Sequence, residues 1–120
     1  MANLRAGLGR WLLRQAHEHL VPRLRAISER HGLPYRRAFV KRQRTRWASC
    51  SRHRTISVNA KLLFLPARLV DYALTHELCH VAEMYHSRRF WGRVAQLCPE
   101  YRELDGELRE MWKAIPRWAG

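Results

Sequence analysis

Cysteine, acidic side chains and long apolar runs are all scarce in this sequence of 120 residues. Its three cysteines form no Cys-x-x-Cys pair, which argues against a disulfide framework and suits a reducing compartment, so we expect a cytoplasmic protein. No apolar run reaches the roughly 18 residues that a membrane-spanning helix needs. Arg5, Arg10 and Arg14 interrupt the apolar residues where a signal peptide would need a continuous run.

Basic residues outnumber acidic ones, and the excess lies in the first part of the chain. The net charge is +13, from 23 Lys and Arg against 10 Asp and Glu. Residues 1–70 carry +14 (16 basic, 2 acidic), and residues 71–120 carry −1 (7 basic, 8 acidic). Most of the basic residues are arginines, which suit bidentate contacts with phosphate. We therefore predict DNA or another polyanion as a partner of residues 1–70. The arginines around Cys50 would lower the pKa of its thiol, but a buried cysteine in a turn is the favoured interpretation.

A His-Glu-x-x-His motif, His76-Glu77-Leu78-Cys79-His80, lies within a segment of helical periodicity. On a helix, His76 and His80 leave the same face one turn apart, so both imidazoles can reach one Zn²⁺. Glu77 borders the same pocket, where it can take a proton from a water that the metal activates. Apolar residues surround the motif, which argues against a solvated face. The pattern predicts a zinc site with His76 and His80 as ligands and Glu77 as the catalytic residue.

Catalytic zinc usually has three protein ligands, and His86 is the first candidate for the third. It follows the motif by six residues, and Ser87 next to it can cap a new helix, so we expect the chain to turn there. This spacing matches that of metzincins, but Glu83 stands where metzincins have Gly, so the metzincin label does not apply. Glu100 and Glu103 in a later helix are the alternative third ligands.

Apolar residues recur every three or four positions from Leu4 to Ile27, which predicts a long amphipathic helix with an arginine-rich outer face. Pro22 interrupts this pattern and predicts a kink or a second helix that starts near Val21. The Gly-Leu-Pro sequence at 32–34 ends the helix. We expect the apolar stripe to pack on the rest of the chain, because a domain of this size needs that burial.

The stretch that follows predicts the strands of a small antiparallel sheet. Residues 35–42 alternate loosely, and a second, short strand is expected at 45–47. Residues 48–54 have the composition of a polar turn. Residues 55–59 alternate cleanly between apolar and polar side chains and are the strongest strand prediction in the chain. An extended substrate could pair with the edge of this last strand.

Three helical patterns follow the predicted strands. Pro66 suits the first turn of the helix that carries the motif, which we expect to continue to about Met84. Ser87 caps a second helix, and Pro99 precedes a third. The aromatic residues of these helices recur at helical spacing, which favours a core role over a surface for stacking bases. The order of the elements predicts an α+β fold in a single domain over residues 1–120.

Four motifs occur in an order that resembles one protein family. They are Thr45–Ser51, Thr55–Asn59, Asp71–His80 and His86–Trp91. The arrangement resembles the YgjP-like metallopeptidases, which are relatives of the SprT-like and WLM zinc peptidases. The matching stretch covers roughly residues 35–112, and the chain is short for the YgjP-like branch. Ala48 stands where the family usually has Gly, so the turn expected there would differ slightly.

The resemblance implies a minimal zincin-like α+β domain with a long N-terminal helix, a small sheet, the motif helix and C-terminal helices. It implies zinc on His76, His80 and His86, and Glu77 as general base, in a peptidase that cleaves proteins or peptides. Because SprT-like and WLM relatives act on proteins bound or crosslinked to DNA, it also implies DNA-associated protein substrates.

Two other functions stay open at this point. A nucleoside triphosphate pyrophosphatase could use the same metal, although the sequence has no Gly-rich phosphate loop and no second carboxylate cluster. A non-catalytic nucleic-acid-binding module would hold zinc as a structural ion with four protein ligands. Arg46, His53 and Arg88 are candidate contacts with the substrate or a polyanion, although a surface or packing role is the favoured interpretation for each.

Overall fold

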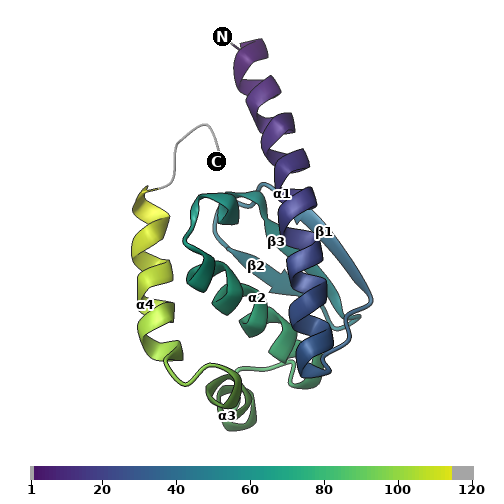
Figure 1. The fold of residues 1–120 in the computed structure, drawn as a ribbon, viewed down its shortest axis with the longest axis vertical. Helices are drawn as coiled ribbons and strands as arrows, with labels where there is room; N and C mark the ends of the chain where they lie inside the picture. The colour runs from purple at the N-terminus through teal and green to yellow at the C-terminus, as the bar shows by residue number, and fades with distance from the viewer. Residues whose placement is uncertain (1, 115–120) are drawn as a thin grey trace.

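The computed structural model of the protein describes residues 2–114, with side chains from residue 6 onward. Within these residues the fold is α+β, as predicted, with helices around one three-stranded sheet. The elements are α1 (Ala2–His31), β1 (Arg37–Lys41), β2 (Ala48–Cys50), β3 (Thr55–Asn59), η1 (Ala60–Phe64), α2 (Ala67–Ala82), α3 (Arg88–Leu97), α4 (Tyr101–Met111) and η2 (Trp112–Ala114). Figure 1 shows α1 and α4 on either side of α2, with α3 joining α2 to α4.

The N-terminal helix α1 packs one side on the body of the fold, as its sequence pattern predicts. Leu12, Leu20 and Leu24 are buried in the main hydrophobic core. The helix is continuous through Pro22, so the alternative of a second helix from Val21 is wrong. Pro22 is exposed, where water can bond the carbonyl that loses its helical partner. Gly32 ends the helix with a φ of 63°, a conformation that glycine adopts without steric cost.

The sheet has the strand order β1-β3-β2 and is mixed, which corrects the predicted antiparallel sheet. β3 pairs antiparallel with β2, its hairpin partner, and Ser49 lies opposite Ser57. β1 pairs parallel with the other side of β3, and Arg37 lies opposite Thr55. Alternation of apolar and polar residues defines which face of a strand is buried, but not its direction or its neighbour. The sequence pattern therefore could not distinguish the two sheets.

Two predictions about the strands are wrong. Residues 48–50 form β2 instead of a turn, and residues 45–47 lie in the loop before it. Ala48 in this strand has a negative φ, so Ala in place of the family's Gly requires no strained backbone. The strand at 55–59 has the predicted bounds, but it is β3 and has a neighbour on both sides. Its edge is therefore not available to an extended substrate.

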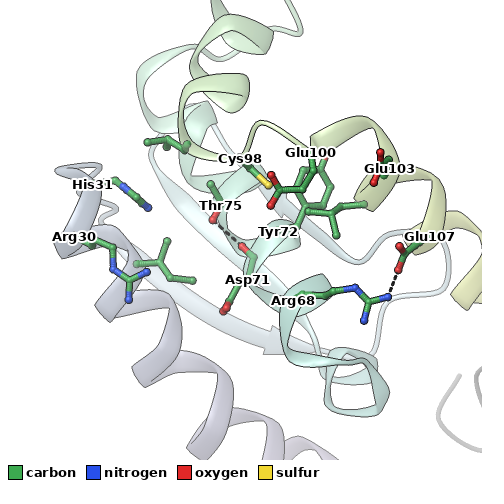
Figure 2. A pocket seen from close by; sticks show the side chains of 13 residues that line it. Arg30, His31, Arg68, Asp71, Tyr72, Thr75, Cys98, Glu100, Glu103 and Glu107 are labelled. Carbon is green, nitrogen blue, oxygen red and sulfur yellow. Dashed lines mark hydrogen bonds and ion pairs between the residues drawn. The ribbon is translucent and has the colours of Figure 1, made fainter.

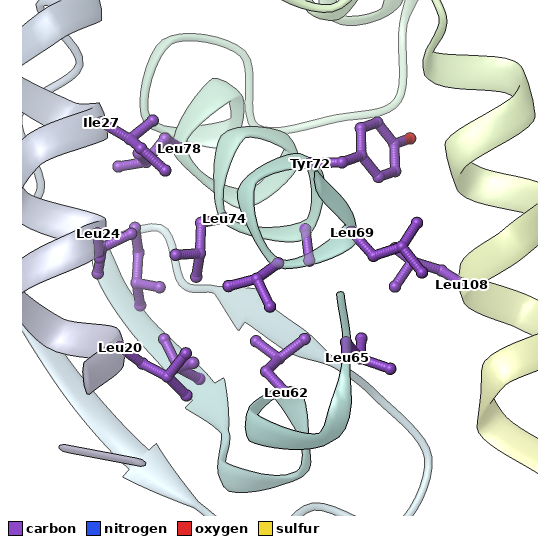
Figure 3. Packing of buried hydrophobic residues seen from close by; sticks show 14 of the residues in the cluster. Leu20, Leu24, Ile27, Leu62, Leu65, Leu69, Tyr72, Leu74, Leu78 and Leu108 are labelled. Atoms are coloured by element: carbon purple, nitrogen blue, oxygen red, sulfur yellow. The ribbon is translucent and has the colours of Figure 1, made fainter. Parts of the chain in front are cut away.

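Helix α2 lies at the centre of the hydrophobic core and carries the His-Glu-x-x-His motif. Figure 3 shows Leu24 of α1 beside Leu74 and Ile27 of α1 beside Leu78 on one side of α2, and Leu108 of α4 near Leu69 on the other side. The 3₁₀ segment η1 closes the core below α2 and contributes further leucines. Because α2 is packed on both sides, the face that carries the motif has a fixed orientation relative to α3, α4 and β2.

The helix boundaries follow the capping signals in the sequence to within about two residues. Pro66 comes directly before α2, at the N-cap and thus next to the first helical position, as predicted. Ser87 caps α3 as predicted, because its hydroxyl accepts a hydrogen bond from the Phe90 N–H at 3.2 Å. Among the described residues, no helix is both long and apolar enough to cross a bilayer.

Candidate metal centre

Three histidines from two segments meet near the C-terminal end of α2. His76 and His80 lie one turn apart on the helix, and His86 lies in the loop between α2 and α3. One ring nitrogen of each lies within 4.8 Å of those of the other two. The ring centroids are 5.4 Å apart for His76 and His80, and 4.8 Å apart for His80 and His86. Across residues 2–114, no other group of His, Cys, Asp and Glu side chains comes close enough to share a metal ion.

Two aromatic residues of α3 hold the histidine rings in place. Phe90 is fully buried and stacks on His80 with a centroid distance of 4.3 Å, and it also contacts His76 edge to face at 5.0 Å. Trp91 stacks on His86 at 5.7 Å. The helical spacing of these aromatic residues predicted a core role, and Phe90 has one. The spacing of residues within one helix does not show which residues of another segment they contact. The packing of Phe90 and Trp91 on the histidine rings was therefore not predicted.

The electrostatic surroundings of the histidines suit metal binding, which needs neutral imidazoles. Burial, with His80 and His86 nearby, lowers the pKa of His76 from 6.5 to about 4. Burial also lowers the pKa of His80. The Nδ1–H of His80 can donate to the Glu83 carbonyl oxygen at 3.1 Å, which leaves Nε2 to a metal. The Nδ1 atom of His76 is buried without a hydrogen-bond partner. Three imidazoles, two of them held neutral, fit the donor set of Zn²⁺.

Glu77 lies next to the histidines, with its side chain only 13% exposed. Its Oε2 atom is 4.0 Å from Nε2 of His76. Burial raises the pKa of Glu77 from 4.5 to about 7, and the charge of Arg46 opposes this rise. A carboxyl group with a pKa near neutrality can both accept and return a proton at physiological pH, as a general base must.

A pocket of about 220 Å³ opens beside His76 and Glu77. The loop before β2 contributes Arg46 to its lining, and α4 contributes Asp105. Arg46 was predicted as a substrate contact, and its place in this lining agrees with such a role. Asp105 had no sequence signal, because its position in an acidic amphipathic helix suggested an ordinary solvated carboxylate.

The other two predicted contacts, His53 and Arg88, do not line this pocket. His53 is exposed in the turn between β2 and β3, where its backbone N–H donates to the Ser51 hydroxyl at 3.2 Å. Arg88 is the exposed first residue of α3. It follows His86 closely in sequence but lies outside the lining of the pocket beside Glu77. The structure thus brings Arg46 to the site and leaves His53 and Arg88 as predictions for contacts at the surface.

The alternative third ligands, Glu100 and Glu103, do not join the histidine group. They line a different pocket of about 400 Å³, between the end of α1 and the start of α4. Figure 2 shows them on the wall opposite Arg30 and His31. This arrangement favours His86 over either glutamate as the third ligand.

Cys50 has a raised thiol pKa, which agrees with the favoured interpretation of a buried cysteine and not with a thiol whose pKa the arginines lower. Burial raises the pKa of Cys50 to about 11, and the negative charge of Glu77 adds to this rise. Arg44, Arg52 and Arg54 are exposed, so water and salt screen their charges. Sequence neighbours were therefore a poor guide, because Cys50 points toward the interior and the arginines toward solvent.

Asn59 fixes the loop that carries Arg46, and no sequence signal indicated this role. The residue is fully buried at the end of β3. Its Nδ2 amide donates to the carbonyl oxygens of Gln43 and Arg46, at 3.0 and 2.6 Å. Its Oδ1 atom accepts a hydrogen bond from the Lys61 N–H at 3.0 Å. Asn59 thereby holds both ends of the Gln43–Arg46 segment against the sheet.

We expect the substitution Asn59→Asp to lower the free energy of unfolding by about 2–3 kcal/mol, because a carboxylate would face two carbonyl oxygens in a buried site. Urea denaturation measures this change. Gln96→Glu makes the same amide-to-carboxylate change at an exposed position of α3 and should alter stability by less than about 0.5 kcal/mol. Equal unfolding midpoints for the two variants would contradict the role given to Asn59.

The stability of the metal-free protein should depend on pH through His76 and Glu77, with opposite signs. The pKa of His76 is lowered to about 4, so its contribution is present above pH 6.5 and is lost as the pH falls toward 4. The pKa of Glu77 is raised to about 7, so its contribution is present below pH 4.5 and is lost as the pH rises through 7.

Glu77→Gln separates these two effects. Between pH 5 and pH 8, the free energy of unfolding of the metal-free wild type should fall by about 1–3 kcal/mol relative to that of the metal-free Gln variant. Urea unfolding at both pH values measures it. A difference that does not change with pH would mean that Glu77 ionises as readily in the folded protein as in the unfolded chain.

The fold and the site define a class of protein. A His-Glu-x-x-His helix lies beside a small sheet, with a third histidine close by and a carboxyl group poised near neutrality, as in metal-dependent peptidases. The chain belongs to the YgjP-like metallopeptidase domain family, whose family model matches residues 1–111. The match begins at residue 1, so it includes α1, which lies outside the stretch that carries the sequence motifs.

The solved structures include a metallopeptidase of similar fold. The chain is similar to the crystal structure of the metallopeptidase zymogen of Pyrococcus abyssi abylysin, with a TM-score of 0.62 and 28% identity. The similarity covers 75% of this chain and 90% of that chain. No curated protein matches the chain. The protein is thus a hydrolase of the metallopeptidase type, and the comparisons support a peptidase over a nucleotide pyrophosphatase or a non-catalytic module.

Proposed function

We propose that the protein is a zinc-dependent peptidase in which His76, His80 and His86 hold the ion and Glu77 is the general base. The observation that carries this proposal is the convergence of three imidazole nitrogens within 4.8 Å next to a buried carboxyl group. This donor set is the one that catalytic zinc sites use when they keep a position open for water. Family membership implies a metal ion and a protein or peptide substrate. A cytoplasmic location and a single-domain organisation remain predictions.

The residues of the site divide the work of peptide hydrolysis. A bound Zn²⁺ would lower the pKa of a water molecule and polarise the carbonyl of the scissile bond. Glu77 accepts a proton at its carboxylate and returns it to the leaving amine, for which its pKa near 7 is suited. Phe90 and Trp91 fix the imidazole rings by stacking, so that their nitrogens stay directed to one point.

The open edge of β2 is the element against which an extended substrate would lie. β2 is the terminal strand of the sheet, so its outer edge has no strand partner among the described residues. Ala48 of this strand lines the pocket that also contains His76 and Glu77. A peptide that adds as a further strand at this edge would therefore pass directly by the two residues. This proposal replaces the prediction that the strand at 55–59 receives the substrate.

Mass spectrometry of cleavage products tests the proposed function. The zinc-loaded protein is incubated with an unfolded protein substrate, with and without single-stranded DNA. New peptides that appear with the wild type and are absent with Glu77→Gln would support a peptidase with this general base. The absence of any new peptide under both conditions would contradict it, and the release of pyrophosphate from nucleoside triphosphates would then favour the alternative hydrolase.

A polyanion such as DNA is the partner proposed for the basic half of the chain. Exposed arginines line the outer side of α1, including Arg10, Arg14 and Arg25, and β1 adds Arg37 and Lys41 at an exposed edge of the sheet. α1 and β1 also pack against each other, and we infer that their basic side chains form one region of the surface. Such a region would bring a DNA-bound protein substrate near the site by electrostatic attraction.

Salt-dependent binding tests this partner. Binding of single-stranded DNA should weaken with salt, and the triple change of Arg10, Arg14 and Arg25 to Gln should reduce the slope of log K against log salt by roughly 0.7 for each phosphate that an arginine no longer neutralises. The control changes the exposed Arg89, Arg93 and Arg102 to Gln, which removes the same charge from the C-terminal half. An equal decrease of affinity in both variants would show that only net charge matters and that residues 1–70 form no specific contact surface.

A further inference from the structure

The pocket beside the general base has a negative charge that the proposed hydrolysis does not use. Asp105 of α4 lines this pocket together with His76 and Glu77, and its negative charge acts on His76. Its side chain is 29% exposed, and it also lines a second pocket with Arg102 and Arg109. The mechanism needs one carboxyl group as general base, and Glu77 already supplies it. The charge of Asp105 therefore calls for a separate explanation.

Two hydrogen bonds hold the carboxylate of Asp105 in a fixed position. The Tyr72 hydroxyl donates to Oδ1 at 3.2 Å, and Nη2 of Arg109 donates to Oδ2 at 2.9 Å. Burial, followed by the charge of Asp105, raises the pKa of Tyr72, so the hydroxyl keeps its proton and remains a donor. The two oxygens of a carboxylate can accept about four hydrogen bonds, so capacity for further donors remains.

The arginine that pairs with Asp105 is largely exposed, so the ion pair is weak. The Arg109 side chain is 81% exposed, and an ion pair at such a position is screened by solvent. The other cation in the lining is Arg46, whose charge acts on Glu77. A substrate cation that enters the pocket would thus meet a fixed carboxylate with limited competition.

The walls of the pocket also favour a long cationic side chain. Trp47 and Tyr72 contribute aromatic rings, and Leu108 contributes an aliphatic side chain, so the methylene groups of a lysine or arginine would have apolar surface to contact. Trp47 packs edge to face on Trp112 at 4.6 Å, and the ammonium of Lys61 already lies 4.5 Å over the Trp112 ring. A volume of about 220 Å³ has room for one side chain of that size.

We propose that Asp105 is a specificity-determining residue that selects peptides with lysine or arginine next to the scissile bond. This inference rests on the proposed peptidase function and assigns its substrate class. The ammonium or guanidinium group donates to the Asp105 carboxylate at the end of the pocket, and the aromatic rings enclose the stem. A substrate with an acidic residue at this position would face repulsion from both Asp105 and Glu77.

Cleavage-site mapping of an unfolded protein is the first test. Lys and Arg should be enriched at one of the two positions that flank the cut. A pair of synthetic peptides is then made from the best-cleaved sequence, one with lysine and one with its uncharged isostere norleucine. The wild type should prefer the lysine peptide by roughly tenfold or more in kcat/KM, the usual size of a hydrogen bond to a charged group. Asp105→Asn should abolish that preference, and the matched control Glu103→Gln, on the same helix at the other pocket, should keep it.

Peptide binding separates a failure of this inference from a failure of the proposed function. Zinc-loaded Glu77→Gln protein is titrated with the lysine, norleucine and glutamate versions of an acetylated pentapeptide amide, and affinity is measured by calorimetry. Tighter binding of the lysine peptide supports the inference, and it does so without any turnover. Equal affinities, or a preference for glutamate through Arg46, would overturn it. Cleavage without a basic preference would overturn only the role of Asp105 and leave the peptidase standing.

Discussion

Replacing Glu77 by Gln is expected to lower kcat by about 10²–10⁴-fold, the usual contribution of a general base, while Zn²⁺ binding is retained. Gln has nearly the same shape as Glu and can occupy the same buried position next to His76, but it cannot accept the proton. The amide also removes the burial penalty that raises the pKa of Glu77 to about 7, so the variant should fold at least as well as the wild type. Steady-state cleavage of a peptide and metal analysis of the purified protein measure the two properties.

The control for this prediction is Glu110→Gln, an exposed carboxylate near the end of α4 that forms an ion pair with Lys113. Its kcat should match that of the wild type. If Glu77→Gln retained full activity with zinc bound, another group would have to be the base, and the assignment of Glu77 would be wrong. If the variant lost zinc together with activity, Glu77 would be part of the metal site and its role as base would lack support.

Replacing His80 by Ala should abolish the stabilisation of the protein by zinc. A ligand that binds only the folded state stabilises it by about 2.7 kcal/mol at a free concentration of 100 times its Kd. His80 is held ready for this role, because Nδ1 faces the Glu83 carbonyl and Phe90 stacks on the ring. Without this imidazole two donors remain, and an ion held by two histidines alone binds far more weakly.

Thermal unfolding with and without Zn²⁺ measures this effect. The wild type should show a clear rise in Tm on addition of zinc, and His80→Ala should show none. Loss of the stacked ring also destabilises the metal-free variant, so the comparison is the shift caused by zinc in each protein and not the Tm itself. His19→Ala, at an exposed position of α1, is the control and should keep the full shift. An undiminished shift in His80→Ala would place the zinc site elsewhere.

The same assay decides the third ligand. The Tm shift caused by zinc should be lost in His86→Ala and kept in Glu100→Ala and Glu103→Ala.

The local parts of this protein follow from its sequence to a large extent. The stripe of leucines in α1, the Pro66 and Ser87 boundaries and the bounds of the strand at 55–59 are all confirmed, because they depend on backbone periodicity and capping within a few residues. The relation of His76 to His80 is of the same kind, since four residues on a helix bring two side chains to one face. The family resemblance rests on these same local motifs and is confirmed.

The predictions that failed concern contacts between segments distant in sequence. β1 pairs with β3 in parallel, and β2 consists of residues that have the composition of a turn. Strand pairing depends on which segments lie side by side in the fold, and the alternation of apolar and polar residues does not encode this. The alternative of a lowered thiol pKa for Cys50 failed for a similar reason. Its sequence neighbours are arginines, but in the fold it is partly buried and lies near Glu77, which comes from another element.

The sequence by itself determined the chemistry available to this protein: a pair of histidines and a glutamate on one helix, a further histidine at a turn, and a strongly basic first half. Only the tertiary structure decided how that chemistry is arranged. It joined His86 to the motif and separated Glu100 and Glu103 from it, and it brought Asp105 to the pocket beside Glu77. The reason is physical: helical spacing fixes positions within a segment, whereas the packing of α3, α4 and the sheet on α2 depends on the shape of the whole core.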